Sequence, residues 1–158
     1  MEVMNTVYFI YESVFGNIVI ESDGKAITCV KTEGNTEPVG RKAADALTDL
    51  AARQLGEYFA GKRTRFDVPL HPRGTPFQCV VWKELCEIPF GETRSYKQIA
   101  QAVGNPDACR AVGMANNKNP IWIFIPCHRV IGTNGMLTGY GGGIEMKQKL
   151  LDIEKNRN

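Results

Sequence analysis

Residues 125–130 read Ile-Pro-Cys-His-Arg-Val, at the end of an apolar run that begins at Ile121 and just before a glycine-rich segment. Proline fixes its own φ and lacks an N–H, so Pro126 predicts that a buried strand from Ile121 ends there and that a turn begins. Neighbouring side chains in a strand point to opposite faces, whereas a turn would allow Cys127 and His128 to cooperate. The stretch therefore predicts a cysteine nucleophile held beside a histidine.

Activation of Cys127 needs further groups. A thiol in an apolar setting is a poor nucleophile until it loses its proton, so the site needs a proton path through His128, directly or through water. It also needs an acid to orient the imidazole ring, and Glu154, on a predicted helix over Ile144–Glu154, is a candidate. Although a cysteine in an apolar run is more often structural, Pro-Cys-His-Arg followed by glycines favours catalysis here.

The composition is typical of a globular, reduced protein. The chain has 158 residues, 43% of them apolar and 23% charged, which suffices for one hydrophobic core or two small ones. Its five cysteines are an odd number without a Cys-x-x-Cys pair, which argues against a disulfide framework and a zinc cluster. No apolar stretch approaches the ~18 residues that span a bilayer, and no basic signal sequence precedes Lys25. We expect a cytoplasmic protein without a bound metal or a membrane partner.

The net charge of +2 is unevenly distributed. Residues 1–75 hold 9 basic and 10 acidic side chains, and residues 76–158 hold 10 and 7. Within Gly91–Arg129 the only acidic side chains are Glu92 and Asp107. This excess of bases hints at contact with phosphate, although an ordinary solvated surface explains it equally well.

Two domains are predicted, 1–70 and 76–158, on either side of a linker at 71–75. Three runs of β-branched and aromatic residues, separated by turns that contain glycine, predict an antiparallel meander. The runs are Val7–Glu12, Asn17–Glu21 and Lys25–Lys31. Helical spacing over Arg41–Ala60 predicts a helix, and alternation over Arg65–Leu70 predicts one more strand of the same sheet.

The second domain is predicted to be mostly helical. Thr75 and Pro76 are typical of the cap and first turn of a helix. Two short helices follow, with a turn that contains glycine between them, in helix-turn-helix form. They are predicted over Thr93–Val103, with Ser95 as the candidate cap, and over Asp107–Ala115. Any compact helical domain can produce this pattern, so alone it favours DNA binding only weakly.

The second of these helices has small side chains around a single long cation, Arg110. A surface without bulk can approach a narrow groove of DNA, and one long side chain can then reach into the base stack. Small residues also allow a helix to pack closely on its neighbours, and at this point both interpretations stay open. The small residues are Ala108, Ala111, Gly113 and Ala115.

Six segments resemble, in order and spacing, the O6-alkylguanine-DNA alkyltransferases, also called methylated-DNA–protein-cysteine methyltransferases. They are Thr75–Trp82, Ile88–Tyr96, Arg110–Gly113, Asn119-Pro120, Ile125–Val130 and Gly139–Gly142. The resemblance is close over residues 75–154, where Pro-Cys-His-Arg-Val is highly specific. It implies an α/β fold: a small N-terminal antiparallel sheet with a helix, ribonuclease H-like in architecture, followed by the mostly helical domain with its helix-turn-helix.

The resemblance also implies an activity. Cys127 would attack the alkyl carbon on O6 of a guanine flipped out of double-stranded DNA, and would keep the alkyl group as a thioether, once per molecule. O4-methylthymine is a second expected substrate, and binding is expected in the minor groove with Arg110 in the gap left by the base. The resemblance implies no cofactor, and the chain has no Gly-x-Gly-x-x-Gly fingerprint. We expect a monomer.

Roles for individual residues follow from the resemblance. His128 and Glu154 would carry the proton away from the cysteine. Asn119 would hold the backbone of the turn, and the hydroxyl of Tyr96 would protonate the leaving guanine. Further contacts to the base or to DNA are expected from Ser95, Ala111, Gly113, Ala115, Arg129, Val130, Tyr140 and Gly141. Some relatives carry serine where this chain has Gly141, which predicts a looser loop here.

Two other functions stay open. Alkyltransferase-like proteins bind damaged DNA without catalysis and replace the reactive cysteine, so Cys127 argues against that class. An unrelated Cys-His hydrolase would require turnover and an oxyanion site, and release of many product molecules per protein would identify it.

Overall fold

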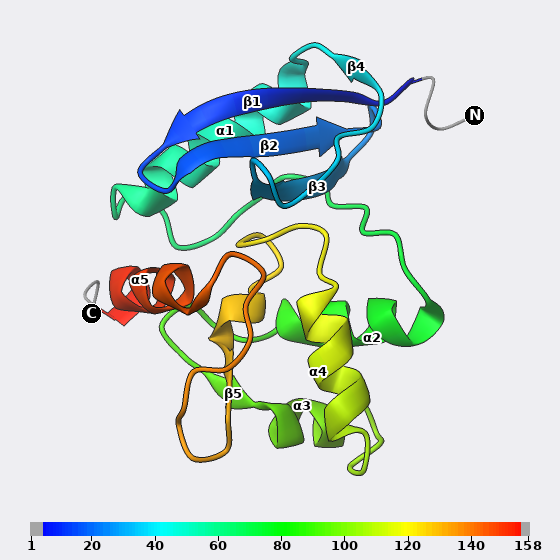
Figure 1. The fold of residues 1–158 in the computed structure, drawn as a ribbon, viewed down its shortest axis with the longest axis vertical. Coiled ribbons are helices and arrows are strands. Elements are labelled where there is room, and N and C mark those ends of the chain that lie inside the picture. Colours follow the sequence, from blue (N-terminus) through cyan, green and yellow to red (C-terminus); the bar gives the residue numbers. More distant parts are fainter. Residues whose placement is uncertain (1–4, 156–158) are drawn as a thin grey trace. The chain divides into compact units, whose positions relative to one another are not determined.

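The structure, a computed structural model that describes residues 5–155, divides the chain into one unit up to Pro72 and another from Arg73 onward (Figure 1). The first unit is a small sheet with one helix, and the second is mostly helical. This is the predicted fold class. Within the described residues, no helix combines the length and apolar character needed to cross a bilayer.

The sheet of the first unit is a meander with one added strand. β1 (Val7–Ser13), β2 (Gly16–Ser22) and β3 (Ile27–Thr32) pair antiparallel, as predicted. Gly16, with a φ of 90°, makes the tight turn between β1 and β2. β4 (Arg41–Lys42) pairs parallel with β1, so the sheet is mixed, in the order β3-β2-β1-β4.

Helix α1 (Ala46–Phe59) contacts β1, β2 and β3, and Figure 1 shows it running along the sheet. It begins five residues later than predicted because Asp45 caps it. The Asp45 carboxylate accepts a hydrogen bond from the Thr48 amide at 2.7 Å, and the Thr48 hydroxyl accepts one from the Asp45 amide at 2.9 Å. Its buried residues are Thr48, Ala51, Gln54, Leu55 and Tyr58.

Residues 65–70 do not form the predicted strand. Only Leu70 pairs, in an isolated parallel bridge with Ile27 of β3. The Asp67 amide donates to the side-chain oxygen of Gln54 in α1 at 3.1 Å, and the Asp67 carboxylate accepts from the Gln54 amide group. Because α1 takes the hydrogen bonds that a neighbouring strand would supply, the segment stays irregular.

The helices of the second unit are α2 (Pro76–Leu85), α3 (Tyr96–Ala102), α4 (Cys109–Asn117) and α5 (Ile144–Lys155). Thr75 and Ser95 cap α2 and α3, as the sequence predicted, and each forms a capping box. α2, α3 and α4 contact one another, and the indole N–H of Trp82 in α2 donates to the carbonyl of Ala115 in α4 at 2.8 Å. Two short strands, β5 (Arg94–Ser95) and β6 (Val130–Ile131), pair parallel.

The apolar run before Cys127 is a tight turn, not the predicted strand. Trp122 and Ile125 form an isolated bridge, and the Ile125 amide donates back to the Ile121 carbonyl at 3.0 Å. Ile123 has a φ of 76°, which a β-branched side chain rarely adopts. Strain of this kind costs on the order of 1–3 kcal/mol and persists only where the surroundings impose it.

Candidate active site

Cys127 opens a single 3-10 turn, Cys127–Arg129, at the end of the tight turn. Pro126 redirects the chain with φ −80° and ψ 63°, and the Cys127 amide donates to the Ile125 carbonyl at 2.7 Å. These values describe an inverse γ-turn. The cysteine is buried, with only 3% of its surface exposed, so it can react only with a group that enters the site.

Asn119 holds this turn from inside. Its side-chain oxygen accepts from the Ile121 amide at 2.9 Å, and its amide group donates to the Ile125 carbonyl at 2.8 Å. Asn116 donates to the Cys127 carbonyl at 3.4 Å. Both asparagines are buried. The contacts support the role that the resemblance gives Asn119, and they account for the strained backbone between its two partners.

His128 and Glu154 form a buried pair. Nε2 of His128 lies 2.7 Å from Oε2 of Glu154, and both side chains are almost fully enclosed. An ionised carboxylate can only accept, so Nε2 carries the hydrogen and Nδ1 carries the lone pair. Burial lowers the pKa of His128 although Glu154 favours the protonated ring, so the imidazole is neutral near pH 7. Nδ1 is buried and has no hydrogen-bond partner among the described residues, which leaves it available to accept a proton.

Arg129 keeps Glu154 charged. Its Nε donates to Oε1 at 2.8 Å, its Nη2 donates to Oε2 at 3.0 Å, and its Nη1 donates to the Ile88 carbonyl at 2.7 Å. Burial alone would raise the pKa of Glu154, but the hydrogen bond from His128 and the hydrogen bonds and charge of Arg129 lower it to about 2. Arg129 is itself buried. Arg129 therefore supports Glu154 in this structure, and its expected contact to DNA stays a prediction.

The lowered pKa of Glu154 predicts acid sensitivity. The ordinary value is 4.5 and the folded value is about 2, so the unfolded chain takes up this proton first as the pH falls. The stabilisation is complete above about pH 4.5 and is lost as the pH falls toward 2. Urea unfolding at a series of pH values between about 2 and 6 should show this slope, and Glu154→Gln should reduce it. An unchanged slope in the variant would assign the acid sensitivity to other carboxyl groups.

Lys147 was missed by the sequence analysis. Its Nζ is buried and donates to the carbonyls of Val130 and Thr138 at 2.6 and 2.9 Å. Burial lowers the pKa of Lys147 to about 8, although the nearby Cys127 favours the charged form. A signal was available, because Lys147 precedes Glu154 by seven residues and both lie on the buried face of α5.

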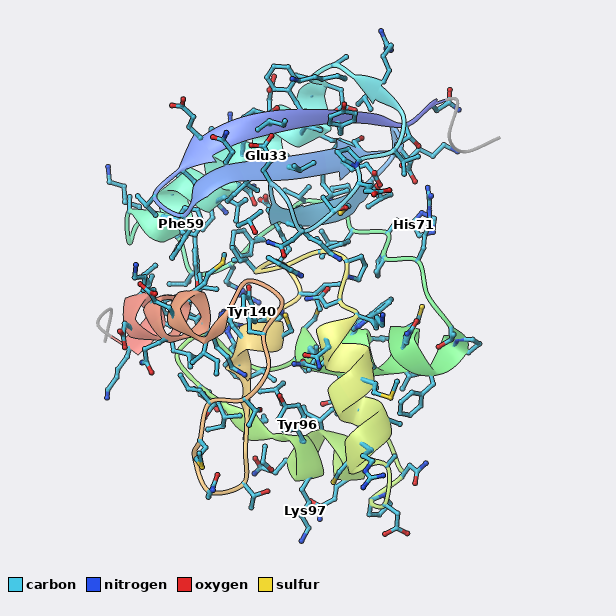
Figure 2. All side chains as sticks on the ribbon, in the orientation of Figure 1. Glu33, Phe59, His71, Tyr96, Lys97 and Tyr140 are labelled. Carbon is cyan, nitrogen blue, oxygen red and sulfur yellow. The ribbon has the colours of Figure 1, made fainter. Side chains whose placement is uncertain are left out.

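The glycine-rich loop, residues 132–143, packs on several elements of this unit. The Thr138 hydroxyl donates to the hydroxyl of Tyr96, the first residue of α3, at 2.8 Å. Tyr140 is buried with its ring 5.4 Å from that of Trp122, and Figure 2 labels both tyrosines. A Cβ at Gly141 would lie 2.4 Å from the Trp122 ring. Gly141 therefore permits close packing on Trp122, and the looser loop stays a prediction.

The outer face of α4 differs in part from the predicted smooth surface. Arg110 and Ala111 are exposed, as expected for contacts to DNA. Met114, one turn after Arg110, is 66% exposed and adds a long apolar side chain that the sequence analysis did not consider. Ala115 is buried, so its side chain does not lie on this face.

Gly113 and Ser95 have local structural partners. A Cβ at Gly113 would lie 3.9 Å from the Tyr96 ring, so the ring lies near α4 at this glycine. The Ser95 hydroxyl accepts from the Gln98 amide at 3.0 Å and caps α3.

The site thus has a buried thiol, a neutral imidazole whose Nδ1 has no hydrogen-bond partner within residues 5–155, and a charged carboxylate bound to Nε2 of the same ring. Such a series can take up the proton of a cysteine that attacks carbon. Within the described residues, no three histidine, cysteine, aspartate or glutamate side chains lie together as metal ligands.

Comparison with known proteins gives the family. The profile of the 6-O-methylguanine DNA methyltransferase DNA binding domain matches residues 76–156, and that of its ribonuclease-like domain matches residues 6–72. The methylated-DNA–protein-cysteine methyltransferase of Methanosarcina acetivorans is 49% identical over 151 residues, which cover 93% of this chain and 97% of that protein. The protein of the same name from Methanosarcina barkeri is 62% identical over 106 residues, 67% of each chain.

A crystal structure of Mycobacterium tuberculosis OGT in complex with DNA matches with a TM-score of 0.91 and 48% identity, and covers 96% of this chain and 94% of that one. Both units are therefore matched in sequence and in fold. Together with the Cys127 turn and its buried His128–Glu154 pair, these matches show that the chain belongs to the 6-O-methylguanine DNA methyltransferase family.

Proposed function

We propose that this protein repairs DNA by transferring the methyl group of O6-methylguanine to Cys127, once per molecule. The observation that carries the proposal is the buried pair of His128 and Glu154 beside the cysteine, with Nδ1 of the ring free to accept a proton. A thiol that is merely structural needs no such pair. Membership of the family supplies the substrate class, because the relatives are named for methylated DNA.

The proposed transfer proceeds in one displacement. The Cys127 proton passes to Nδ1 of His128, through a water molecule or directly, and Glu154 stabilises the imidazolium that forms. The sulfur attacks the methyl carbon, the S–C bond forms as the C–O6 bond breaks, and the electron pair stays on guanine. Guanine then takes the proton of the Tyr96 hydroxyl. A thioether has no easy route back to a thiol, so each molecule reacts once.

Access to a methyl group inside a duplex requires extrusion of the nucleotide. We propose that α4 approaches the minor groove and that Arg110 fills the gap in the base stack, since both Arg110 and Ala111 are exposed on one face of the helix. Tyr140 and the Val130 carbonyl would contact the extruded base. O4-methylthymine carries its methyl group on an exocyclic oxygen in the same way and would be a second substrate. A monomer would suffice, because every proposed group belongs to one chain.

The test is the mass of the intact protein after mixing with a short duplex that contains one O6-methylguanine. We expect a stoichiometric gain of one methyl group (~14 Da), located on Cys127 by peptide mapping and absent from Cys127→Ala. Cys86→Ala is a matched control, because Cys86 is an exposed thiol at the end of α2, outside the Cys127–Arg129 turn, and should stay unmodified. Tight binding to the duplex without a mass gain would instead indicate a damage-binding protein. Multiple turnovers would indicate a hydrolase.

A further inference from the structure

We propose that Thr138 is a positioning residue for the proton of Tyr96, and that Lys147 fixes Thr138 for this role. The inference rests on the proposed function and deepens it. Thr138 belongs to the glycine-rich loop, and the transfer step proposed above does not involve its side chain.

The hydrogen bond between the two hydroxyl groups has a defined direction. The Thr138 hydroxyl donates and the Tyr96 oxygen accepts, at 2.8 Å. Because the phenol oxygen already accepts a hydrogen bond from the loop, its own hydrogen can point elsewhere. The same bond stabilises the phenolate that forms when Tyr96 gives up its proton, since hydrogen bonds to a charged acceptor are stronger than those to a neutral one.

The hydroxyl end of Tyr96 is held by the loop, through the hydrogen bond from Thr138 at 2.8 Å. The ring lies near α4 at Gly113, where an added Cβ would come within 3.9 Å of two ring carbons. A variant that keeps the volume of Thr138 and removes its hydroxyl should therefore act on the hydroxyl proton of Tyr96.

Lys147 connects Thr138 to the segment that carries the nucleophile. Its Nζ donates to the Thr138 carbonyl at 2.9 Å and to the Val130 carbonyl at 2.6 Å, and Val130 directly follows the Cys127–Arg129 turn. Thr138 is otherwise an exposed loop residue. A single buried cation thus sets the distance between the loop and the turn, and with it the place of the Thr138 hydroxyl.

The proton balance of the step is complete. As the S–C bond forms and the C–O6 bond breaks, guanine receives the electron pair and then the Tyr96 proton. Tyr96 becomes a phenolate that accepts the hydrogen bond of Thr138. The thiol proton, held on His128 as an imidazolium, is released to solvent water while water supplies a proton to the phenolate. The net change is the transfer of one proton from the thiol to guanine.

The test compares Thr138→Val, which has nearly the same shape without the hydroxyl, with Thr138→Ser, which keeps it. In single-turnover reactions with saturating methylated duplex, we expect Thr138→Val to slow transfer roughly tenfold at unchanged affinity for the duplex. Thr138→Ser should stay within about twofold of the natural protein. Thr133→Val is the matched control, because Thr133 is an exposed threonine of the same loop and should leave the rate unchanged.

A double-mutant cycle with Tyr96→Phe tests whether Thr138→Val slows transfer through the Tyr96 hydroxyl. If Thr138 acts through Tyr96, Thr138→Val has no further effect once the phenol is gone. Additive effects, an unchanged rate in Thr138→Val, or an unchanged rate in Tyr96→Phe would each overturn the inference. In all three cases a methyl group on Cys127 would leave the proposed function intact, whereas its absence from the natural protein would overturn the function itself.

Discussion

Glu154→Gln is expected to slow methyl transfer by roughly 10²–10⁴-fold, the range typical of a lost proton-transfer group. The substitution keeps the shape of the side chain and removes its charge. His128 then loses the anion that stabilises its protonated ring, and its Nε2–H no longer donates to a carboxylate at 2.7 Å. The same change leaves the buried Arg129 without its counter-ion, so we expect the free energy of unfolding to fall by roughly 3–5 kcal/mol.

Two controls separate the loss of chemistry from the loss of stability. Glu145→Gln makes the same chemical change on the same helix, where the carboxylate is exposed and lies 3.3 Å from Lys149. An exposed pair contributes about 0–1 kcal/mol, so both rate and stability should change little. The double variant Arg129→Met/Glu154→Gln removes both buried charges and should regain part of the stability. If the double variant also regains the rate of methyl transfer, Glu154 contributes to the rate only by stabilising the folded structure and not by stabilising the protonated His128.

Local sequence signals predicted the elements of the fold well. Thr75 and Ser95 were predicted as helix caps, and both are caps in the structure, where Gln78 and Gln98 complete capping boxes that were not predicted. A cap is a contact within four residues, so its partners are visible in the sequence. The meander of β1 to β3 was predicted for the same reason, because alternation and tight turns are local patterns.

Long-range contacts account for the errors. Residues 65–70 alternate like a strand, but Gln54 of α1 takes the hydrogen bonds of Asp67. Residues 121–125 are apolar like a buried strand, but Asn119 closes them into a turn. In both places a polar side chain outside the apolar pattern determines the backbone conformation through its hydrogen bonds. The periodicity of the apolar residues carries no information about these hydrogen bonds.

In the candidate site, too, local patterns were predicted from the sequence and long-range contacts were not. Cys127 and His128 are adjacent in the sequence, and their motif pointed to them directly. Arg129 shares that motif, yet its partner Glu154 lies 25 residues away, and its role in holding that carboxylate becomes visible only in the fold. Lys147 is a cation on an apolar helical face, which marks a buried charge but does not reveal that it binds two carbonyls.

Arg110→Ala is expected to slow methyl transfer from duplex DNA by about 10²-fold and to leave transfer from a free O6-alkylguanine base unchanged. The reason is that unstacking a base costs a few kcal/mol, and a side chain that fills the gap offsets part of this cost. A loss of about 3 kcal/mol corresponds to roughly two orders of magnitude in rate. Arg110 is exposed on α4 whereas Cys127 is buried, so removal of the Arg110 side chain should not affect the reaction of a base that needs no extrusion.

Single-turnover rates with both substrates measure this difference, and Arg110→Lys shows which property of the side chain matters. Lysine keeps the charge but lacks the planar guanidinium that stacks on bases. If charge toward phosphate were the main contribution, Arg110→Lys would transfer as fast as the natural protein, and the effect of Arg110→Ala would shrink at high salt. If the side chain fills the base stack, Arg110→Lys remains slow on the duplex at every salt concentration. Equal slowing on the duplex and the free base would place the action of Arg110 at the Cys127 site and would contradict the proposed extrusion.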